Sequence, residues 1–265
     1  MKLIIFSVIG QILKEGRTFQ LFFLLLVGAL AYVSYYLAKK DKIWMIRPLE
    51  ALEAIYEGIG RSAEMGRPAM ILPGISNLGN PQTLAGLTVL GEVTQRSAEI
   101  GADIITCSQQ TDVIVASQAI VRSSYSAVGK QDLYSPGKQV VWFGGDQFSY
   151  AVGASGQIIA HKPALVVYLG YFLWDVIVTA ETGNRMGAIT IGGTLGDLPM
   201  MAMFCDHILI GEEMYAAASA ITRDKFSIAT LASQDWVKIV MISLMLLGGL
   251  LVMAGVPVLP NLLGM

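Results

Sequence analysis

The chain has little charge and few of the residues that build metal or disulfide sites. Only 14% of its 265 residues are charged, whereas soluble domains average about a quarter, so an ordinary soluble protein is not expected. The net charge of −2 leaves no basic surplus for contacts with nucleic-acid phosphates. We therefore expect no nucleic-acid partner.

Two cysteines and two histidines leave little material for a metal centre. Cys107 and Cys205 each lie in an apolar run typical of a strand, and we expect both to be reduced, buried thiols. A disulfide between them is the minor alternative. Cys205, Asp206 and His207 are adjacent, but consecutive residues of a strand point to opposite faces. Without a paired Cys-x-x-Cys or His-x-x-x-His motif, no metal site is predicted.

Sequence motifs for catalysis and nucleotide binding are also lacking. There is no G-x-x-x-x-G-K-[ST] loop, no G-x-G-x-x-G after a strand and no G-x-S-x-G turn. The segment from Gly192 to Asp197 comes nearest to a phosphate loop but has no lysine. We expect no cofactor, and the sequence identifies no catalytic residue, so an enzymatic role is the less favoured of the two possibilities.

Hydrophobic residues make up 54% of the chain, and the mean hydropathy is +0.58, which indicates long apolar segments. No charged residue occurs from Phe19 to Ala38 or from Ile239 to Val256. A bilayer core of ~30 Å needs a helix of ~20 residues. The sequence therefore predicts transmembrane helices at residues 19–38 and 237–259, with a buried core helix as the alternative for each.

The flanking cations predict an orientation. Lysine and arginine concentrate on the cytoplasmic side of membrane helices. They crowd the inner side of both segments, so we expect a multi-pass protein of the cell membrane with the central domain cytoplasmic and both termini outside. The residues after the first segment are Lys39, Lys40, Lys42 and Arg47, against Lys14 and Arg17 before it, and Arg223, Lys225 and Lys238 precede the second.

Two further helices are expected beside the first segment. Residues 1–18 combine apolar and charged positions in a pattern that predicts an N-terminal interfacial helix, or an extension of the membrane helix. Residues 45–62 repeat apolar side chains at helical spacing, and Pro48 suits a first turn. We interpret this segment as an amphipathic helix that couples the anchor to the domain.

Residues 67–222 alternate short apolar runs with helical stretches, which is typical of βαβ units. Continuous apolar strands indicate a largely parallel sheet with helices on both faces. The fold class is thus a membrane-anchored α/β protein. The expected strands are 69–72, 104–107, 140–143, 165–168, 188–191 and 206–210, and Asn80, Thr111 or Asp112, and Asp146 are expected at helix starts.

Residues 164–180 have a second interpretation, as a third membrane span. Asp175 within that stretch would cost ~2.5–3.5 kcal/mol near a bilayer centre. A buried strand followed by a helix explains the same residues at lower cost. Burial would also raise the pKa of Asp175.

Polar residues follow the predicted strands, where parallel α/β sheets bind ligands. As the tentative ligand-binding set we select Asn77, Gln110, Asp112, Asp146, Thr194 and Asp197. The alternative, which we favour, is that the acidic and amide residues cap helices while nearby glycines make turns.

Small residues line two helices, around residues 116–127 and 216–220, and so permit close packing between helices or subunits. With the low charge, this pattern favours a non-enzymatic, homo-oligomeric scaffold whose partners are the bilayer and copies of itself. Other membrane proteins are a further class of partner. The alternatives are a tethered ligand-binding or enzymatic domain, and a channel or transporter subunit with the extra span.

Overall fold

A computed structural model describes residues 18–40, 49–222 and 225–253. The chain divides into two compact units, one within residues 46–222 and one within residues 1–45 and 223–265. The helix expected at residues 1–18 lies almost wholly outside the described residues, as do Pro48 and residues 254–259.

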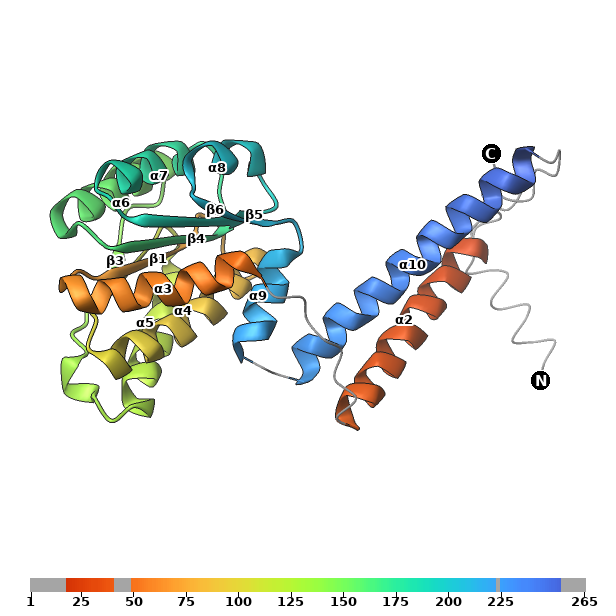
Figure 1. The fold of residues 1–265 in the computed structure, drawn as a ribbon, viewed down its shortest axis with the longest axis horizontal. Coiled ribbons are helices and arrows are strands. Elements are labelled where there is room, and N and C mark those ends of the chain that lie inside the picture. The colour runs from red at the N-terminus through yellow and green to blue at the C-terminus, as the bar shows by residue number, and fades with distance from the viewer. Residues whose placement is uncertain (1–17, 41–48, 223–224, 254–265) are drawn as a thin grey trace. The chain divides into compact units, whose positions relative to one another are not determined.

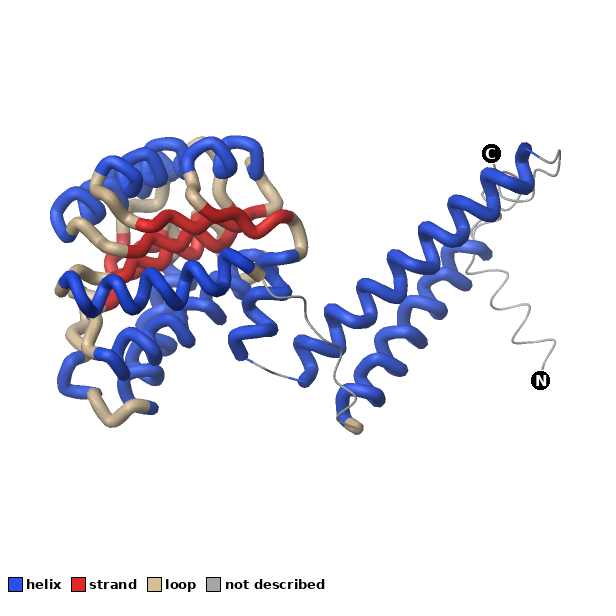
Figure 2. The backbone as a smooth tube through the Cα atoms, viewed as in Figure 1, coloured by secondary structure: helices blue, strands red, loops and turns tan. Residues whose placement is uncertain are grey.

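The unit within residues 46–222 is built on one sheet of six parallel strands, drawn red in Figure 2. Their order is β3-β2-β1-β4-β5-β6, so β1 and β4 lie at the centre. Every residue of β1 and nearly every residue of β4 is buried, as expected when helices cover both faces. The predicted parallel α/β class is confirmed. The strands are β1 (Ala69–Gly74), β2 (Ile104–Ser108), β3 (Val140–Trp142), β4 (Leu165–Tyr171), β5 (Ile189–Thr194) and β6 (His207–Ile210).

Helices form a layer on each face of this sheet (Figure 1). The helices α3, α4, α5 and α9 form one layer and share a core with one face of the sheet. The helices α6, α7 and α8 form the other layer and share a core with the opposite face. The helices are α3 (Glu50–Met65), α4 (Pro81–Ile100), α5 (Thr111–Ala127), α6 (Gln147–His161), α7 (Asp175–Arg185), α8 (Leu198–Phe204) and α9 (Glu213–Thr222), with a short 3-10 turn η1 at Gln131–Leu133.

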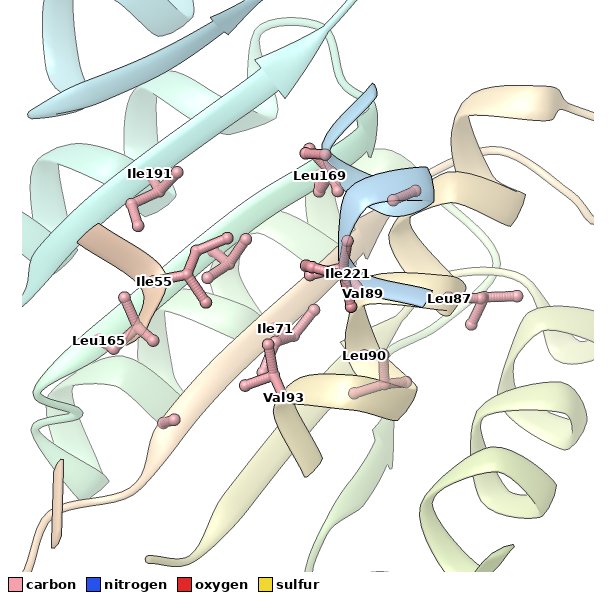
Figure 3. Packing of buried hydrophobic residues seen from close by; sticks show 14 of the residues in the cluster. Ile55, Ile71, Leu87, Val89, Leu90, Val93, Leu165, Leu169, Ile191 and Ile221 are labelled. Atoms are coloured by element: carbon pink, nitrogen blue, oxygen red, sulfur yellow. The ribbon is translucent and has the colours of Figure 1, made fainter. Parts of the chain in front are cut away.

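Branched aliphatic side chains fill the larger core (Figure 3). Ile71 from β1, Leu165 from β4 and Ile55 from α3 belong to this core, and all three are fully buried. Burying one such side chain contributes roughly 1.5–3 kcal/mol. The apolar spacing of α3 therefore docks this helix onto the sheet.

Glycines let two helices approach the sheet closely. A Cβ at Gly58 of α3 would lie 2.6 Å from Leu165 Cδ1, and one at Gly86 of α4 would collide with the Leu169 carbonyl oxygen. A side chain at Gly58 would require Leu165 or the helix to move, and one at Gly86 would require a shift of backbone. These contacts hold α3 and α4 against the central strands.

The boundaries of α4 follow from the sequence. The Asn80 side chain accepts a hydrogen bond from Gln82 N at 2.9 Å, and Pro81 occupies the first turn. Gly101 ends the helix in the left-handed conformation at φ 85°. Both predicted ends are confirmed.

Some local predictions were wrong. The residue before α5 is Gln110, without a side-chain cap, rather than Thr111 or Asp112. Cys205 ends α8 instead of lying in a strand, and it is only partly buried. Residues 164–180 are divided between β4 and α7, as the lower-cost interpretation predicted, and not as one continuous helix.

The second unit contains α2 (Thr18–Lys39) and α10 (Lys225–Met253), which pack antiparallel (Figure 1). Tyr35 and Phe226 meet edge to face, with ring centroids 6.0 Å apart. The second apolar helix begins at Lys225, not at residue 237 as predicted, so Lys225 and Lys238 belong to it. Both helices are long and apolar enough to cross a membrane, by length and composition.

Candidate functional site

All six strands point the same way, so their carboxyl ends meet at one edge of the sheet. The chain runs outward from β1 through β2 to β3, then returns to the other side of β1 as β4. Connections therefore leave β1 and β4 toward opposite faces. Ligands of open α/β sheets bind outside such a point.

The loops after β1 and β2 bring three predicted site residues together. Asp112 Oδ2 accepts from Leu78 N at 3.0 Å, and Gln110 Nε2 donates to the Ile75 carbonyl at 3.2 Å. Asn77 Oδ1 accepts from Gly79 N within its own loop at 3.0 Å. These side chains thus satisfy backbone groups of the loops themselves, which agrees with the structural alternative.

Thr194, at the end of β5, belongs to a second, buried group. Its hydroxyl is 3.3 Å from Gln82 Oε1, which also accepts from Leu195 N at 2.7 Å. Gln82 lies in the first turn of α4. The loop after β5 is therefore fastened to the helix that follows β1.

Asp146 and Asp197 stand apart from these groups. Asp146 is exposed and caps α6, since its carboxylate accepts from Ser149 N at 3.0 Å and from the Ser149 hydroxyl. The Ser149 bonds hold the pKa of Asp146 below its usual range. Asp197 is half-buried at the start of α8 and makes no side-chain cap there.

Among the described residues, Asp175 is the one carboxyl of this edge that is fully buried. Its Oδ1 accepts from Gln147 Nε2 at 2.6 Å and from Leu173 N at 2.9 Å. Burial raises the pKa of Asp175, against the lowering effect of the Leu173 and Gln147 bonds, and Asp197 raises it further. The predicted direction of this shift is confirmed.

Several buried polar atoms around Asp175 have no partner among the described residues. They include Asp175 Oδ2 and the Tyr150 hydroxyl. Burial above all raises the pKa of Tyr150, and the charge of Asp175 adds to this effect. Buried polar groups are almost always hydrogen-bonded, so each of these atoms requires an explanation.

The loops at 75–80, 109–112, 143–147, 172–175 and 195–197, all within the described chain, hold no lysine, arginine or histidine. They hold Asp112, Asp146, Asp175 and Asp197. Asn80 and Asp146 already occupy amide groups at the starts of α4 and α6. An anionic ligand would meet repulsion and few free donors here, whereas a cation or a neutral donor would meet acceptors.

Sequence reasoning missed Gln82 and Tyr150. Both lie inside helices, at apolar or mixed positions that carry no motif. Gln109 and Gln147 come shortly after β2 and β3, yet nothing in the sequence pairs Gln147 with Asp175. Gln82 and Gln147 share one local signal, a polar residue in the first turn of a helix.

The fold and this edge define a doubly wound α/β domain with the strand order 3-2-1-4-5-6 of dinucleotide-binding domains, accompanied by two long apolar helices. A protein family described as a domain of unknown function (DUF6754) matches residues 9–262. The chain belongs to that family. No curated protein matches it.

Proposed function

We propose that this protein is an integral membrane scaffold whose α/β domain assembles with further copies of itself and carries out no catalysis. The observation that carries the proposal is an exposed apolar face on α6, without a charged residue from Gln147 to Ala160, which Trp174 and Val178 extend onto the start of α7. A membrane anchor made of α2 and α10 supports it.

Apolar side chains dominate the exposed surface of α2 and α10. Leu24 is 67% exposed and Leu246 is 65% exposed, among many similar residues. In water, a pair of helices that leaves this much apolar surface uncovered would aggregate. A bilayer would cover the same side chains. Because the two helices are antiparallel, the end of α2 and the start of α10 would lie on the same side of that bilayer.

Orientation is argued from the cations near the inner helix ends. Lys39 and Lys40 lie at the end of α2, and Lys225 begins α10. The positive-inside rule then favours a cytoplasmic α/β domain and external termini. Lys238 lies within α10, where it pairs with Asp235 at 3.4 Å.

The α6 face is unusual for an exposed helix. From Gln147 to Ala160 it has no charged residue, and Phe148, Val152 and Ile159 are exposed at helical spacing. Trp174 at the start of α7 lies beside Phe148, with ring centroids 6.3 Å apart. We name Phe148, Val152, Ile159, Trp174 and Val178 the α6–α7 face.

A second copy is the partner that this face fits best. An uncharged apolar patch meets its own copy across a two-fold axis without like-charge repulsion. A common membrane also confines the copies to one plane and raises their effective concentration. A charged partner surface could form no ion pair with this stretch of α6, because it has no charged side chain.

The test compares two exposed valines on different helix layers. Val152 of α6 is 54% exposed and Val115 of α5 is 66% exposed. In native membranes, we expect cross-linked oligomers from the natural chain and from Val115→Lys, but mainly monomers from Val152→Lys. Monomers alone from the natural chain, or oligomers unaffected by Val152→Lys, would contradict self-assembly through this face.

Anchoring is tested separately by alkaline extraction of membranes. We expect the full chain to stay in the pellet and to enter solution only with detergent. Recovery in the soluble fraction without detergent would remove the membrane role.

A further inference from the structure

We infer that the crevice in which domains of this strand order bind a dinucleotide is closed here by the protein's own chain, so that the α/β domain does not accept such a cofactor. The order β3-β2-β1-β4-β5-β6 implies a dinucleotide site outside the ends of β1 and β4, at the start of the helix that follows β1. That helix is α4. The residues at this point do not fit a dinucleotide, and the inference does not depend on membrane anchoring or on self-assembly.

The turn between β1 and α4 is bonded to its neighbours through its backbone. In a dinucleotide-binding turn, backbone N–H groups point at the pyrophosphate. Here Ile75 N donates to the Tyr171 carbonyl of β4 at 3.0 Å, and Leu78 N donates to Asp112 Oδ2 at 3.0 Å. These two amides are therefore taken by β4 on one side and by the start of α5 on the other.

The first turn of α4 is occupied in the same way. Asn80 N donates to the Asn77 carbonyl at 3.1 Å, Pro81 has no N–H, and Gln82 N donates to Asn80 Oδ1 at 2.9 Å. Asn80 Nδ2 in turn donates to the Ser76 hydroxyl at 3.2 Å. Within the described helix start, Asn80, Pro81 and Gln82 thus offer a phosphate no free backbone donor.

Glycines bring protein backbone into the space where a ligand would lie. A Cβ on Gly86 of α4 would collide with the Leu169 carbonyl oxygen of β4 and would lie 3.3 Å from Pro73 Cα of β1. A Cβ on Gly170 of β4 would collide with the Pro73 carbonyl oxygen. In a dinucleotide site a glycine makes room for the pyrophosphate, whereas these two make room for neighbouring backbone.

Two buried side chains close the crevice on the side of β5. Gln82 is 8% exposed, and its Oε1 accepts from Leu195 N at 2.7 Å. The Thr194 hydroxyl lies 3.3 Å from the same oxygen and accepts from Phe172 N at 3.4 Å. Gln82 and Thr194 therefore join the start of α4 to the loops after β4 and β5.

The carboxyl that follows β2 is also engaged. A dinucleotide site uses an acidic residue to bind the ribose hydroxyls. Asp112 is the first acidic residue after β2, but its Oδ2 holds Leu78 N and its Oδ1 accepts from Val113 N at 2.9 Å. Its oxygens thus fix the loops rather than wait for a ribose.

The first experiment measures dinucleotide binding by the full chain in detergent, with the fluorescence of NADH as the signal. We expect no saturable change up to about 1 mM NADH. Saturable binding by the natural chain would overturn the inference.

Amide hydrogen exchange tests the closure itself on the same sample. We expect Leu195 N to exchange slowly in the natural chain and about tenfold or more faster in Gln82→Ala, which lacks its acceptor. Gln95→Ala is the matched control in α4, because the Gln95 side chain bonds to the exposed Glu99 at 3.4 Å, and it should leave the Leu195 rate unchanged. Unchanged exchange in β2 of Gln82→Ala would show that the opening is local.

Two exchange results would refute the closure. One is exchange of Leu195 N in the natural chain at the rate of an unstructured peptide, a measurement that needs no variant to fold. The other is a Leu195 rate that Gln82→Ala does not change.

Discussion

The contact between α3 and the sheet predicts that two glycine-to-alanine substitutions in α3 change the free energy of unfolding in opposite directions. Gly58 and Gly60 both lie within α3. A Cβ at Gly58 would be 2.6 Å from Leu165 Cδ1 and 3.0 Å from its Cβ and Cγ, whereas a Cβ at Gly60 meets nothing within 4 Å. Leu165 is fully buried in β4, so a shift of its side chain would have to be taken up by the surrounding core.

The magnitudes follow from two opposing terms. Replacing glycine by alanine inside a helix stabilises it by about 0.5–1 kcal/mol, and both variants gain this amount. Overpacking a filled core costs about 1–3 kcal/mol, and only Gly58→Ala incurs it. We expect Gly60→Ala to raise the free energy of unfolding and Gly58→Ala to lower it. The two variants should differ by the overpacking term alone, about 1–3 kcal/mol.

Cys107 provides a reporter that is confined to the α/β domain. It is fully buried in β2, and burial raises the pKa of its thiol far above the ordinary range. Cys205, the only other cysteine, would be replaced by serine. Labelling of Cys107 in a urea titration of the full chain in detergent then gives midpoints, provided that the urea dependence is the same in all variants.

One outcome would refute the packing argument. If Gly58→Ala were as stable as Gly60→Ala, Leu165 would have to move without cost, and α3 would not rest on β4 as described. A loss in both variants would show that α3 does not behave as a continuous helix at these positions.

Three other predictions concern the same domain. Asn80→Ala should lower the free energy of unfolding by about 1 kcal/mol in the same assay, because α4 loses its cap; an unchanged midpoint would exclude that role. Gly86→Ala should destabilise more than Gly58→Ala, because its Cβ meets the Leu169 backbone rather than a side chain, and equal losses would contradict this ranking. Burial raises the pKa of Asp175, so the folded state binds its proton more tightly than the unfolded state. Stability should therefore fall as pH rises from about 4 through the raised pKa, and Asp175→Asn should lessen that fall.

The class of the fold was readable from the sequence because its signals are local. A continuous apolar run such as Leu165–Tyr168 fits only a strand covered on both faces or a buried helix, and its short length decides between them. Asn80, Pro81 and Gly101 mark the ends of α4 by backbone chemistry that acts within a few residues.

The strand order could not be predicted, because the local sequence pattern is much the same in every strand. Nothing in Ala69–Leu72 states that β4 will be its neighbour. The pairing of Gln147 with Asp175 spans 28 residues and depends on α6 lying next to α7. The start of α10 was missed for a different reason: hydropathy marks the apolar part of a helix, whereas Asp235 and Lys238 continue it with charged side chains.

The two helices of the second unit come from opposite ends of the sequence, and this separation has a consequence for biosynthesis. α2 leaves the ribosome well before its partner α10, with the complete α/β domain made between them. Translation at ~5–20 residues per second separates the two helices by roughly 10–40 s. During that interval α2 has no packing partner from its own chain, while the sheet can already form. The helix pair would thus be the last structure to close, after the domain between its halves has folded.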